Sequence, residues 1–341
     1  MALSAPLALV SAVWGAVPNA TARPNVLFLV NDDLRPMIGG WPGGHYPYMA
    51  TPHLDRFMKD SITFTNSHVQ QAVCSPSRTS VLFGRRPDTT RVWDLYTNTR
   101  EVGCAACRTI PQLFRAAGYT TIGMGKIFHD GHASDNQDPP SWTDYRDAAG
   151  AHADDQRYLP GSTFFSGYDD GAGMCQSEGH NGVSPSWRSV DEAVVGLCRD
   201  SQVREHALAV LHRLGQRRAA DGTPFFLAVG FRRPHLPFVA PAKFFDLYPK
   251  AETRLAPNPF APADMPAVAY ASYELQNFGD VAALNFTGQI NETLPDWKAL
   301  EEVRSTRAIS TAISTAISTA PFAARAAAPC SARPTALSTA L

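Results

Sequence analysis

The sequence has no long basic run, almost no net charge and, after its first 22 residues, no apolar stretch of membrane-spanning length. Its 341 residues carry a formal net charge of −1 at pH 7. Nucleic-acid binding relies on clustered lysine and arginine, so nucleic acid is a poor candidate partner. A membrane-spanning helix requires about 20 consecutive apolar residues. We therefore expect neither a nucleic-acid partner nor a membrane span.

The last part of the chain lacks most residue types. After Glu302 there is no Asp, Glu, His, Lys, Asn, Gly, Tyr or Trp, and residues 308–320 read AISTAISTAISTA. A repeat this short buries no core of its own. The whole chain is 44% apolar, and it is long enough for a sizeable core. We therefore expect residues 23–303 to form the folded region and residues 304–341 to be a low-complexity tail outside it.

The first 22 residues are apolar and small, and they end in Ala20-Thr21-Ala22, a small-x-small cleavage pattern. This pattern is typical of a secretory signal peptide, with a disordered leader as the alternative. N-x-T glycosylation acceptors occur at Asn285 and Asn291. These features predict the secretory pathway, with an extracellular or a lysosomal or vacuolar destination.

Export also permits disulfide bonds. Cys175 and Cys198 flank a stretch that a disulfide would close into a loop. Cys104 and Cys107 form a lone C-x-x-C, which is a weak signal for zinc and for redox chemistry alike. A local disulfide or two unreactive thiols is the better interpretation of that pair.

Apolar runs alternate with helical patterns along the chain. Continuous or alternating apolar runs predict strands in NVLFLVN (25–31), SITFTN (61–66), YTTIGMGK (119–126) and TPFFLAVGF (223–231). Proline, glycine and capping residues predict helices over about 52–60, 76–83, 111–117 and 191–214. Alternation of this kind predicts an α/β sandwich with a mostly parallel central sheet and helices on both faces.

Residues suited to chemistry follow the predicted strands. Asp32 and Asp33 end the first, Lys126 and His129 end another, and His235 follows the last. Open parallel sheets place their sites beyond the carboxyl ends of strands. Adjacent carboxylates suit Ca²⁺ or Mg²⁺, although a turn-forming acid pair and a packed histidine are the ordinary interpretations of each residue alone.

Cys74 lies at or just before the start of a predicted helix, because Pro76 suits the first helical turn. Backbone N–H groups at that end favour an anion. Arg78 lies about one helical turn further on and can brace a group at the helix end. Two interpretations stay open from these residues: a nucleophilic cysteine with a lowered pKa, or a buried structural cysteine.

The segment CSPSRTSVLFGR, residues 74–85, resembles the sulfatase signature C-x-P-S-R-x-x-x-L-x-G-R. The resemblance covers roughly residues 24–300 and is greatest to the iduronate-2-sulfatase group. The segments that carry it are NVLFLVNDDLRP, QQAVCSPSRTSVLFGRRPDTTR, GMGKIFH and PFFLAVGFRRPHLPF. The resemblance implies the alkaline-phosphatase-like sandwich, here in truncated form.

The resemblance also implies how position 74 would act. In that family the cysteine is oxidised to Cα-formylglycine by a formylglycine-generating enzyme during export. Cys74 would then be the nucleophile and a metal ligand, and Arg78 would hold its hydroxyl. A hydrated aldehyde carries two hydroxyls: one attacks sulfur, and loss of the proton from the other then expels sulfate. A serine or cysteine lacks the second hydroxyl and would stall.

The remaining implied roles fall on the other strand ends. Asp32 and Asp33 would bind Ca²⁺, with Mg²⁺ as an alternative. Lys126 and His235 would contact the sulfate, and His129 would orient the formylglycine. The positions of Cys175 and Cys198 match a disulfide of the iduronate-2-sulfatase group.

One part of the family pattern is missing. The later Asp-His or Asp-Asn pair and the lysine after it, which complete the metal site in such enzymes, do not occur in the expected region. Either a frameshift or wrong exon junction near Glu302, or a genuine short product, explains this. We expect the chain as written to be inactive or nearly so.

The resemblance makes hydrolysis of sulfate esters in glycans the leading expectation, with glycosaminoglycan degradation as the setting. Two alternatives stay open: a formylglycine-dependent phosphodiester or phosphonate hydrolase, and a catalytically dead glycan-binding or decoy protein. Trp93, Arg91 and Arg232-Arg233 are candidates for a sugar pocket, and surface positions are the alternative for them.

Overall fold

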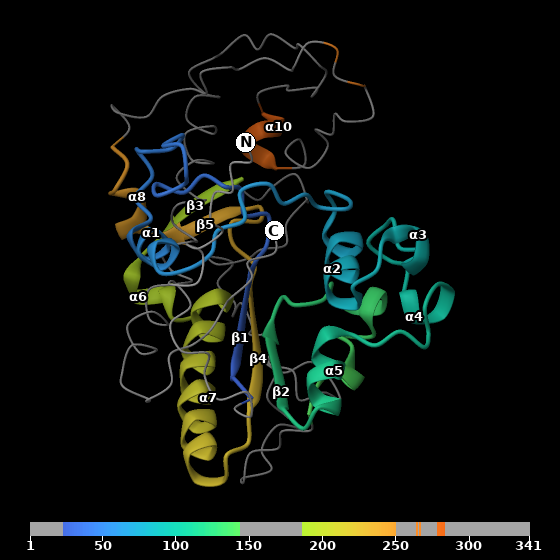
Figure 1. The fold of residues 1–341 in the computed structure, drawn as a ribbon. Coiled ribbons are helices and arrows are strands. Elements are labelled where there is room, and N and C mark those ends of the chain that lie inside the picture. Colours follow the sequence, from blue (N-terminus) through green and yellow to red (C-terminus); the bar gives the residue numbers. More distant parts are fainter. Residues whose placement is uncertain (1–22, 144–185, 250–263, 265, 267–277, 284–341) are drawn as a thin grey trace, which may run out of the picture.

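The computed structural model describes residues 23–143, 186–249, 264, 266 and 278–283 (Figure 1). Its centre is a parallel sheet in the order β1–β4–β2. The three strands are β1 (Val26–Asn31), β4 (Phe225–Phe231) and β2 (Thr120–Gly125). β4 pairs with both other strands, and every residue of β4 and β2 is buried. The predicted mostly parallel α/β sheet is confirmed.

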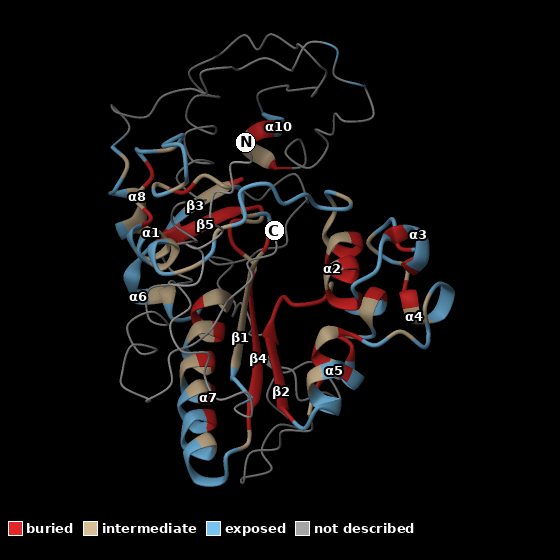
Figure 2. Ribbon diagram, in the orientation of Figure 1, coloured by how far each residue is buried: buried red, intermediate tan, exposed pale blue. Residues whose placement is uncertain are grey.

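Helices cover both faces of this sheet (Figures 1 and 2). On one face, α7 (Arg199–Asp221) packs Val203 and Val210 against Leu227 of β4. On the other face, α2 (Cys74–Phe83) and α5 (Ile110–Ala116) contribute to a second apolar cluster around Phe226. The side chains of β4 alternate between these two clusters, as the two-residue period of a strand requires.

Two glycines allow the ends of β2 and β4 to approach closely. Gly125 pairs with Gly230 in the register of the two strands. A Cβ atom on Gly230 would lie 2.0 Å from the carbonyl oxygen of Lys126, and one on Gly125 would lie 1.9 Å from the carbonyl oxygen of Gly230. Gly125 also has φ +70°, a backbone conformation that favours glycine. The chain segments that leave these two strands therefore start side by side.

The predicted helix starts are confirmed in two cases. α1 (Pro52–Lys59) begins directly after Thr51. α5 begins after Thr109, whose side chain forms a capping box with Gln112. Gly118, with φ +82°, follows the end of α5 and lets the chain turn into β2. Local signals were sufficient here because capping and proline placement act within one helical turn.

Two secondary-structure predictions were wrong. SITFTN (61–66) forms no strand in the described structure, and its Ile62 and Phe64 are exposed. An alternating pattern becomes a strand only when a neighbouring strand pairs with it. The helix predicted over 191–214 is two helices, α6 (Glu192–Val195) and α7, and α7 continues to Asp221. The break comes at Cys198, which has extended dihedral angles and is disulfide-bonded.

The other described elements are short. They are α3 (Pro87–Thr90), α4 (Thr99–Val102), η1 (Gly131–Ser134), η2 (Pro139–Ser141), α8 (Ala242–Phe245), α10 (Gly279–Ala282) and the paired strands β3 (Trp187–Val190) and β5 (Phe238–Pro241). Among the described helices, none combines the length and apolar character needed to cross a bilayer.

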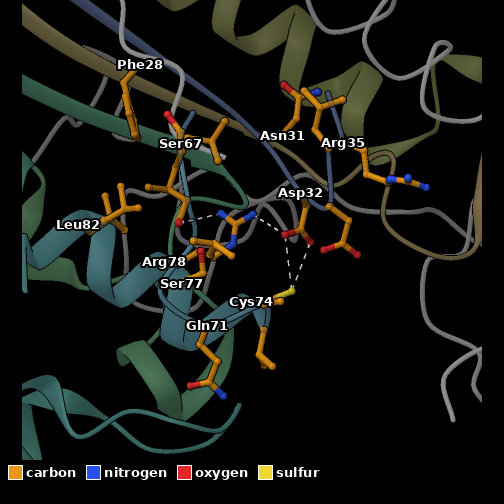
Figure 3. A pocket seen from close by; sticks show the side chains of 18 residues that line it. Phe28, Asn31, Asp32, Arg35, Ser67, Gln71, Cys74, Ser77, Arg78 and Leu82 are labelled. Atoms are coloured by element: carbon orange, nitrogen blue, oxygen red, sulfur yellow. Dashed lines mark hydrogen bonds and ion pairs between the residues drawn. The ribbon is translucent and has the colours of Figure 1, made fainter. Parts of the chain in front are cut away.

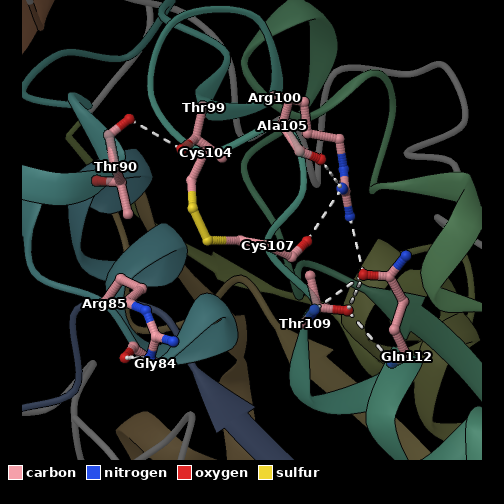
Figure 4. The surroundings of a disulfide bond; sticks show 10 residues. All are labelled: Gly84, Arg85, Thr90, Thr99, Arg100, Cys104, Ala105, Cys107, Thr109 and Gln112. Atoms are coloured by element: carbon pink, nitrogen blue, oxygen red, sulfur yellow. Dashed lines mark hydrogen bonds between the residues drawn. A yellow bond between two sulfur atoms is a disulfide. The ribbon is translucent and has the colours of Figure 1, made fainter.

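Cys104 and Cys107 form a disulfide, which agrees with the local pairing considered from the sequence (Figure 4). Arg100 holds this loop from one side: it donates to the carbonyl oxygen of Cys107 at 3.3 Å and to Gln112 Oε1 at 3.0 Å. The partner of Cys198 lies outside the described residues, so its predicted pairing with Cys175 stays a prediction. Residues 1–22, Asn285, Asn291 and 304–341 also lie outside the described residues.

Candidate active site

Residues from four separate segments meet beyond the carboxyl end of the sheet, and Figure 3 shows two of them, Asp32 and Cys74. One ligand atom each from Asp32, Cys74 and His235 lies within 4.8 Å of the others. Lys126 joins this group, because its Nζ lies 3.6 Å from the Sγ of Cys74 and forms an ion pair with Asp32. The convergence expected at the strand ends is therefore present for these residues.

The end of β1 places the two aspartates. The backbone N–H of Asp32 still donates to the carbonyl oxygen of Phe231 at 3.0 Å, so Asp32 is held against the end of β4. The chain then turns at Asp33, which has φ +58°, a left-handed conformation that aspartate adopts more readily than most residues. This turn brings Asp33 Oδ2 to 3.8 Å from His235 Nε2. The two adjacent carboxylates can face one region because the strand has already ended.

Asp32 is a buried carboxylate shared between two cations. Its side chain accepts a hydrogen bond from Arg78 Nη2 at 2.6 Å and pairs with Lys126. Burial alone would raise the pKa of Asp32, but the positive charges of Arg78, Lys126 and His235 hold that pKa well below its ordinary value. Asp32 is therefore ionised, and its negative charge is balanced inside the protein.

Arg78 braces the loop that carries Lys126. Its Nη1 donates to the carbonyl oxygens of Lys126 and Ile127 at 2.6 and 2.9 Å. Burial would lower the pKa of Arg78, but Asp32 raises it above the ordinary value. The role implied for Arg78, holding a hydroxyl at position 74, stays a prediction. In this structure its partners are a carboxylate and two backbone carbonyls.

Cys74 is the first residue of α2, and Val73 is the N-cap. Its Sγ lies 3.6 Å and 3.9 Å from the two carboxylate oxygens of Asp32. Burial, and then the negative charge of Asp32, raise the pKa of the Cys74 thiol to about 11. The interpretation of Cys74 as a thiolate nucleophile with a lowered pKa is therefore wrong, because these two effects outweigh the helix end and the nearby lysine.

The two histidines differ in position. His235 lies within the group, and its Nδ1 is 2.7 Å from the carbonyl oxygen of Leu236. His129 makes its hydrogen bond to the backbone oxygen of Asp130, at 3.1 Å, and burial lowers its pKa. Among the described residues, His129 has no hydrogen bond to Cys74. Its implied orienting role stays a prediction.

The sequence analysis missed a polar network behind the site. Gln137 is fully buried; its Oε1 accepts from the backbone N–H of Phe128 at 2.7 Å, and its Nε2 donates to Asp130 Oδ1 at 2.5 Å. The other carboxylate oxygen of Asp130 pairs with Arg232. Asp200 accepts from the backbone N–H groups of Arg232 and Arg233, at 2.9 Å each. These contacts join residues far apart in the sequence, and no local sequence pattern indicates which distant polar residues will pair.

A cavity of about 380 Å³ opens beside Cys74, between the end of β1 and the start of α2. Its lining combines apolar side chains such as Phe28, Val30 and Leu82 with Asp32, Asp33 and Cys74. Arg35 and Gln71 also contribute to its wall (Figure 3). Neither was singled out from the sequence, since each stands outside the strand-end pattern. The cavity offers space for a small anionic group next to the thiol.

The donor set fits a hard divalent cation in its chemistry. The ligand atoms of Asp32, Cys74 and His235, which lie within 4.8 Å of one another, are close enough to share one ion. Asp33 Oδ2 lies 3.8 Å from His235 Nε2 of that group. Carboxylate oxygens suit Ca²⁺ or Mg²⁺. The residues that would hold the cation are therefore Asp32, Asp33 and the group at position 74.

Comparisons with known proteins agree with this arrangement. The family model described as Sulfatase matches residues 24–294. Iduronate 2-sulfatase of Mus musculus is 37% identical over 286 residues, 82% of this chain, and that of Homo sapiens is 36% identical over 272 residues, 79% of this chain. The chain spans only 47% and 46% of the lengths of these two relatives.

The fold is also found among solved structures. A phosphonate monoester hydrolase from Silicibacter pomeroyi superimposes with a TM-score of 0.51 at 20% identity, covering 89% of this chain and 59% of that one. At this level of identity the likeness concerns the fold alone. It agrees with the alkaline-phosphatase-like architecture expected from the sequence.

Proposed function

The chain belongs to the sulfatase family, and on that basis we propose that this protein hydrolyses sulfate esters of glycans, as an iduronate-2-sulfatase-like enzyme. The observation that carries the proposal is the position of Cys74. It starts the family signature, lies at the first position of α2, and faces Asp32 and Lys126 at 3.6 Å. A sulfate group next to this cysteine would meet a lysine and a histidine beyond the end of the sheet.

Cys74 is better suited to be a precursor than a nucleophile in its own right. With a pKa of about 11, the thiol is protonated at neutral pH, and a thiol attacks far more slowly than a thiolate. Conversion to Cα-formylglycine by a generating enzyme during export would supply a hydrated aldehyde, whose two hydroxyls allow attack on sulfur and then release of sulfate. The proposal therefore includes that enzyme as a partner, and residence in the secretory pathway or in a lysosomal compartment.

The surrounding side chains have separate tasks in this proposal. Lys126 and His235 supply positive charge where the sulfuryl oxygens gain negative charge. Arg78 fixes the loop of Lys126 through two backbone carbonyls, so the ammonium group is positioned before the substrate arrives. Asp32 and Asp33 would hold a divalent cation, Ca²⁺ with Mg²⁺ as the alternative, which supplies Lewis-acid stabilisation when bound.

The proposal is tested by producing the chain in a secretory host together with a formylglycine-generating enzyme. Conversion is read from the mass of the tryptic peptide 60–78, which contains Cys74. Sulfate release is then measured with 4-nitrophenyl sulfate and with a uronate 2-sulfate, at several Ca²⁺ and Mg²⁺ concentrations. Because the chain as written is expected to be inactive or nearly so, the expected result for the sulfatase is slow sulfate release that requires both Cys74 and a divalent cation.

Two controls decide between this proposal and the alternatives. An aryl phosphodiester offered in the same assay tests the phosphodiester or phosphonate hydrolase. Because the later metal ligands expected from the resemblance do not occur in the sequence, the converted 341-residue chain is expected to be much slower than a sulfatase that has them. The converted chain could instead bind a sulfated glycan and turn over none of the esters. This result would contradict the proposal that the protein is an enzyme and would favour a glycan-binding protein.

A further inference from the structure

The loop between α3 and α4 presents two aromatic side chains to solvent. Trp93 is 54% exposed and Tyr96 is 76% exposed. Their neighbour Val92 is fully buried, so the backbone is anchored between Arg91 and Trp93, which both face outward. Exposed large aromatic groups that lie close together commonly mark a binding site.

This loop touches the wall of the cavity beside Cys74. Gln71 lines that cavity, and its Nε2 donates to the backbone carbonyl oxygen of Trp93 at 2.8 Å. Because a carbonyl oxygen lies close to its own Cα atom, the backbone of Trp93 is within about 6 Å of the Gln71 amide. Gln71 also stands three residues before Cys74. The aromatic loop and the candidate active site are therefore adjacent.

The loop is ordered by its own hydrogen bonds. Asp94 Oδ1 accepts from the backbone N–H groups of Tyr96 and Thr97 at 2.9 and 2.7 Å, and Asp94 Oδ2 accepts from Thr97 Oγ1 at 2.8 Å. At the end of the loop, Asn98 Nδ2 donates to the carbonyl oxygen of His132 at 3.1 Å. A loop fixed in this way presents its aromatic groups at little cost in conformational entropy on binding.

Charged groups of both signs lie next to these rings. The carboxylate of Asp94 is engaged by hydrogen bonds from Tyr96 and Thr97 within the loop, whereas Arg91 is exposed immediately before Val92 and the exposed Arg35 lines the cavity. Pyranose rings have apolar C–H faces that stack on flat aromatic side chains, and uronate and sulfate groups pair with guanidinium groups. An anionic sugar chain matches both properties.

We propose that Trp93 and Tyr96 form a stacking subsite for the sugar residues that flank the sulfated residue of an anionic glycan, with Arg91 as the charged partner. This inference rests on the proposed function and narrows its substrate class to oligomeric glycans. In this proposal Trp93 and Tyr96 determine the affinity for the glycan, and they lie outside the group of residues that performs hydrolysis.

The test measures binding to the full chain by isothermal titration calorimetry, in a Cys74→Ala background that prevents turnover. The probes are sulfated tetrasaccharides from heparin and from dermatan sulfate, their desulfated counterparts, and a monosaccharide sulfate. We expect Trp93→Ala combined with Tyr96→Ala to weaken tetrasaccharide binding by about tenfold or more, the size of one or two stacking contacts, and to leave monosaccharide binding unchanged. Trp93→Phe should retain most of the affinity.

Tyr48→Ala is the matched control, because Tyr48 is 60% exposed and does not line the cavity. It should bind both tetrasaccharides as the parent does. Equal tetrasaccharide affinity in the parent and in the Trp93 and Tyr96 variant would overturn the inference, as would a parent that binds neither tetrasaccharide. Release of sulfate from 4-nitrophenyl sulfate by the chain with Cys74 intact is measured separately. The proposed hydrolysis is thus tested independently of the proposed stacking subsite.

Discussion

Asp130 and Arg232 form an ion pair between the loop that follows β2 and the loop that follows β4. The first loop carries Lys126 and the second carries His235. Gln137 holds Asp130 from the opposite side through a hydrogen bond of 2.5 Å. The spacing between two candidate sulfate-binding groups is thus fixed partly by a contact outside the candidate active site.

This ion pair predicts a specific pH dependence of stability. Burial would raise the pKa of Asp130, but Arg232 and other cations lower it below the ordinary 3.8. A carboxylate with a lowered folded-state pKa stabilises the fold above its ordinary pKa, and this contribution is lost as the pH falls through the folded-state value. We expect Asp130→Asn to lower Tm at neutral pH, and the difference from the parent to shrink below pH 3.8.

Thermal unfolding followed by circular dichroism between acidic and neutral pH would measure this difference. Asp60→Asn is the control, because Asp60 is exposed and its side chain has no ion pair in the described structure. A difference in Tm between Asp130→Asn and the parent that stays constant across this range would contradict the assignment.

Removal of Arg78 should destabilise the protein strongly. Asp32 would keep Lys126 as a partner but would lose a buried guanidinium that also binds two carbonyls. Breaking a buried pair on one side typically costs about 3–5 kcal/mol. We expect a loss of this size in the free energy of unfolding of Arg78→Met, measured by urea denaturation.

The exposed pair of Arg86 and Asp88 provides the comparison for Arg78. Its two side chains are 82% and 76% exposed, and their charged atoms lie 3.5 Å apart. Surface pairs contribute about 0–1 kcal/mol, so Arg86→Met should unfold nearly as the parent does. Equal effects of Arg78→Met and Arg86→Met would show that the buried network is not what stabilises this region.

Substitution of Cys74 separates attack on sulfur from release of sulfate. Cys74→Ala should release no sulfate, because no nucleophile remains at position 74. Cys74→Ser should stop after a single attack at most, since a lone hydroxyl has no second group to expel the sulfate. Mass spectrometry of peptide 60–78 would show the trapped sulfate ester, and continued multiple turnover by either variant would disprove the proposed role.

A methyl group at Gly230 should disrupt the contact between β4 and the loop of Lys126. The added Cβ would lie 2.0 Å from the Lys126 carbonyl oxygen; that oxygen belongs to the backbone and the Cβ position is fixed by the backbone, so neither can rotate away. We expect Gly230→Ala to cost more than about 3 kcal/mol in the free energy of unfolding. Gly215 is the matched position: it is exposed within α7 and has open space around it.

Gly215→Ala should stabilise the protein by about 0.5–1 kcal/mol, since alanine favours a helix interior over glycine. The change in the free energy of unfolding of each variant is measured by urea denaturation. A decrease for Gly230→Ala and an increase for Gly215→Ala would support the close approach of β2 and β4. A mild effect at Gly230 would mean that the two strand ends have room to separate.

Local patterns in the sequence were enough to predict the central sheet and the residues at its edge. The apolar runs of β1 and β4 are continuous, and buried parallel strands have few other sequences available to them. The signature around Cys74 identified the family because its spacing is specific. In both cases the information lies within a few neighbouring residues.

Features that depend on residues far apart in the chain could not be predicted in the same way. The pairing of Asp130 with Arg232 joins positions 102 residues apart, and a buried glutamine such as Gln137 resembles a surface residue in the sequence. The raised pKa of Cys74 was missed for the same reason, because it follows from burial and from Asp32 rather than from the helix end. SITFTN (61–66) was assigned as a strand because its alternation is local, whereas pairing is not.

The strand order has a consequence for the timing of assembly. In the described structure β1 and β2 each pair with β4 and not with each other, so neither has its observed partner until β4 is synthesised. At about 5–20 residues per second, the roughly 150 residues between Cys74 and the end of β4 take on the order of ten seconds to emerge. During that interval the cysteine segment has no finished sheet to fold against. The proposed modification of Cys74 would therefore have time to take place before β4 pairs with β1 and β2.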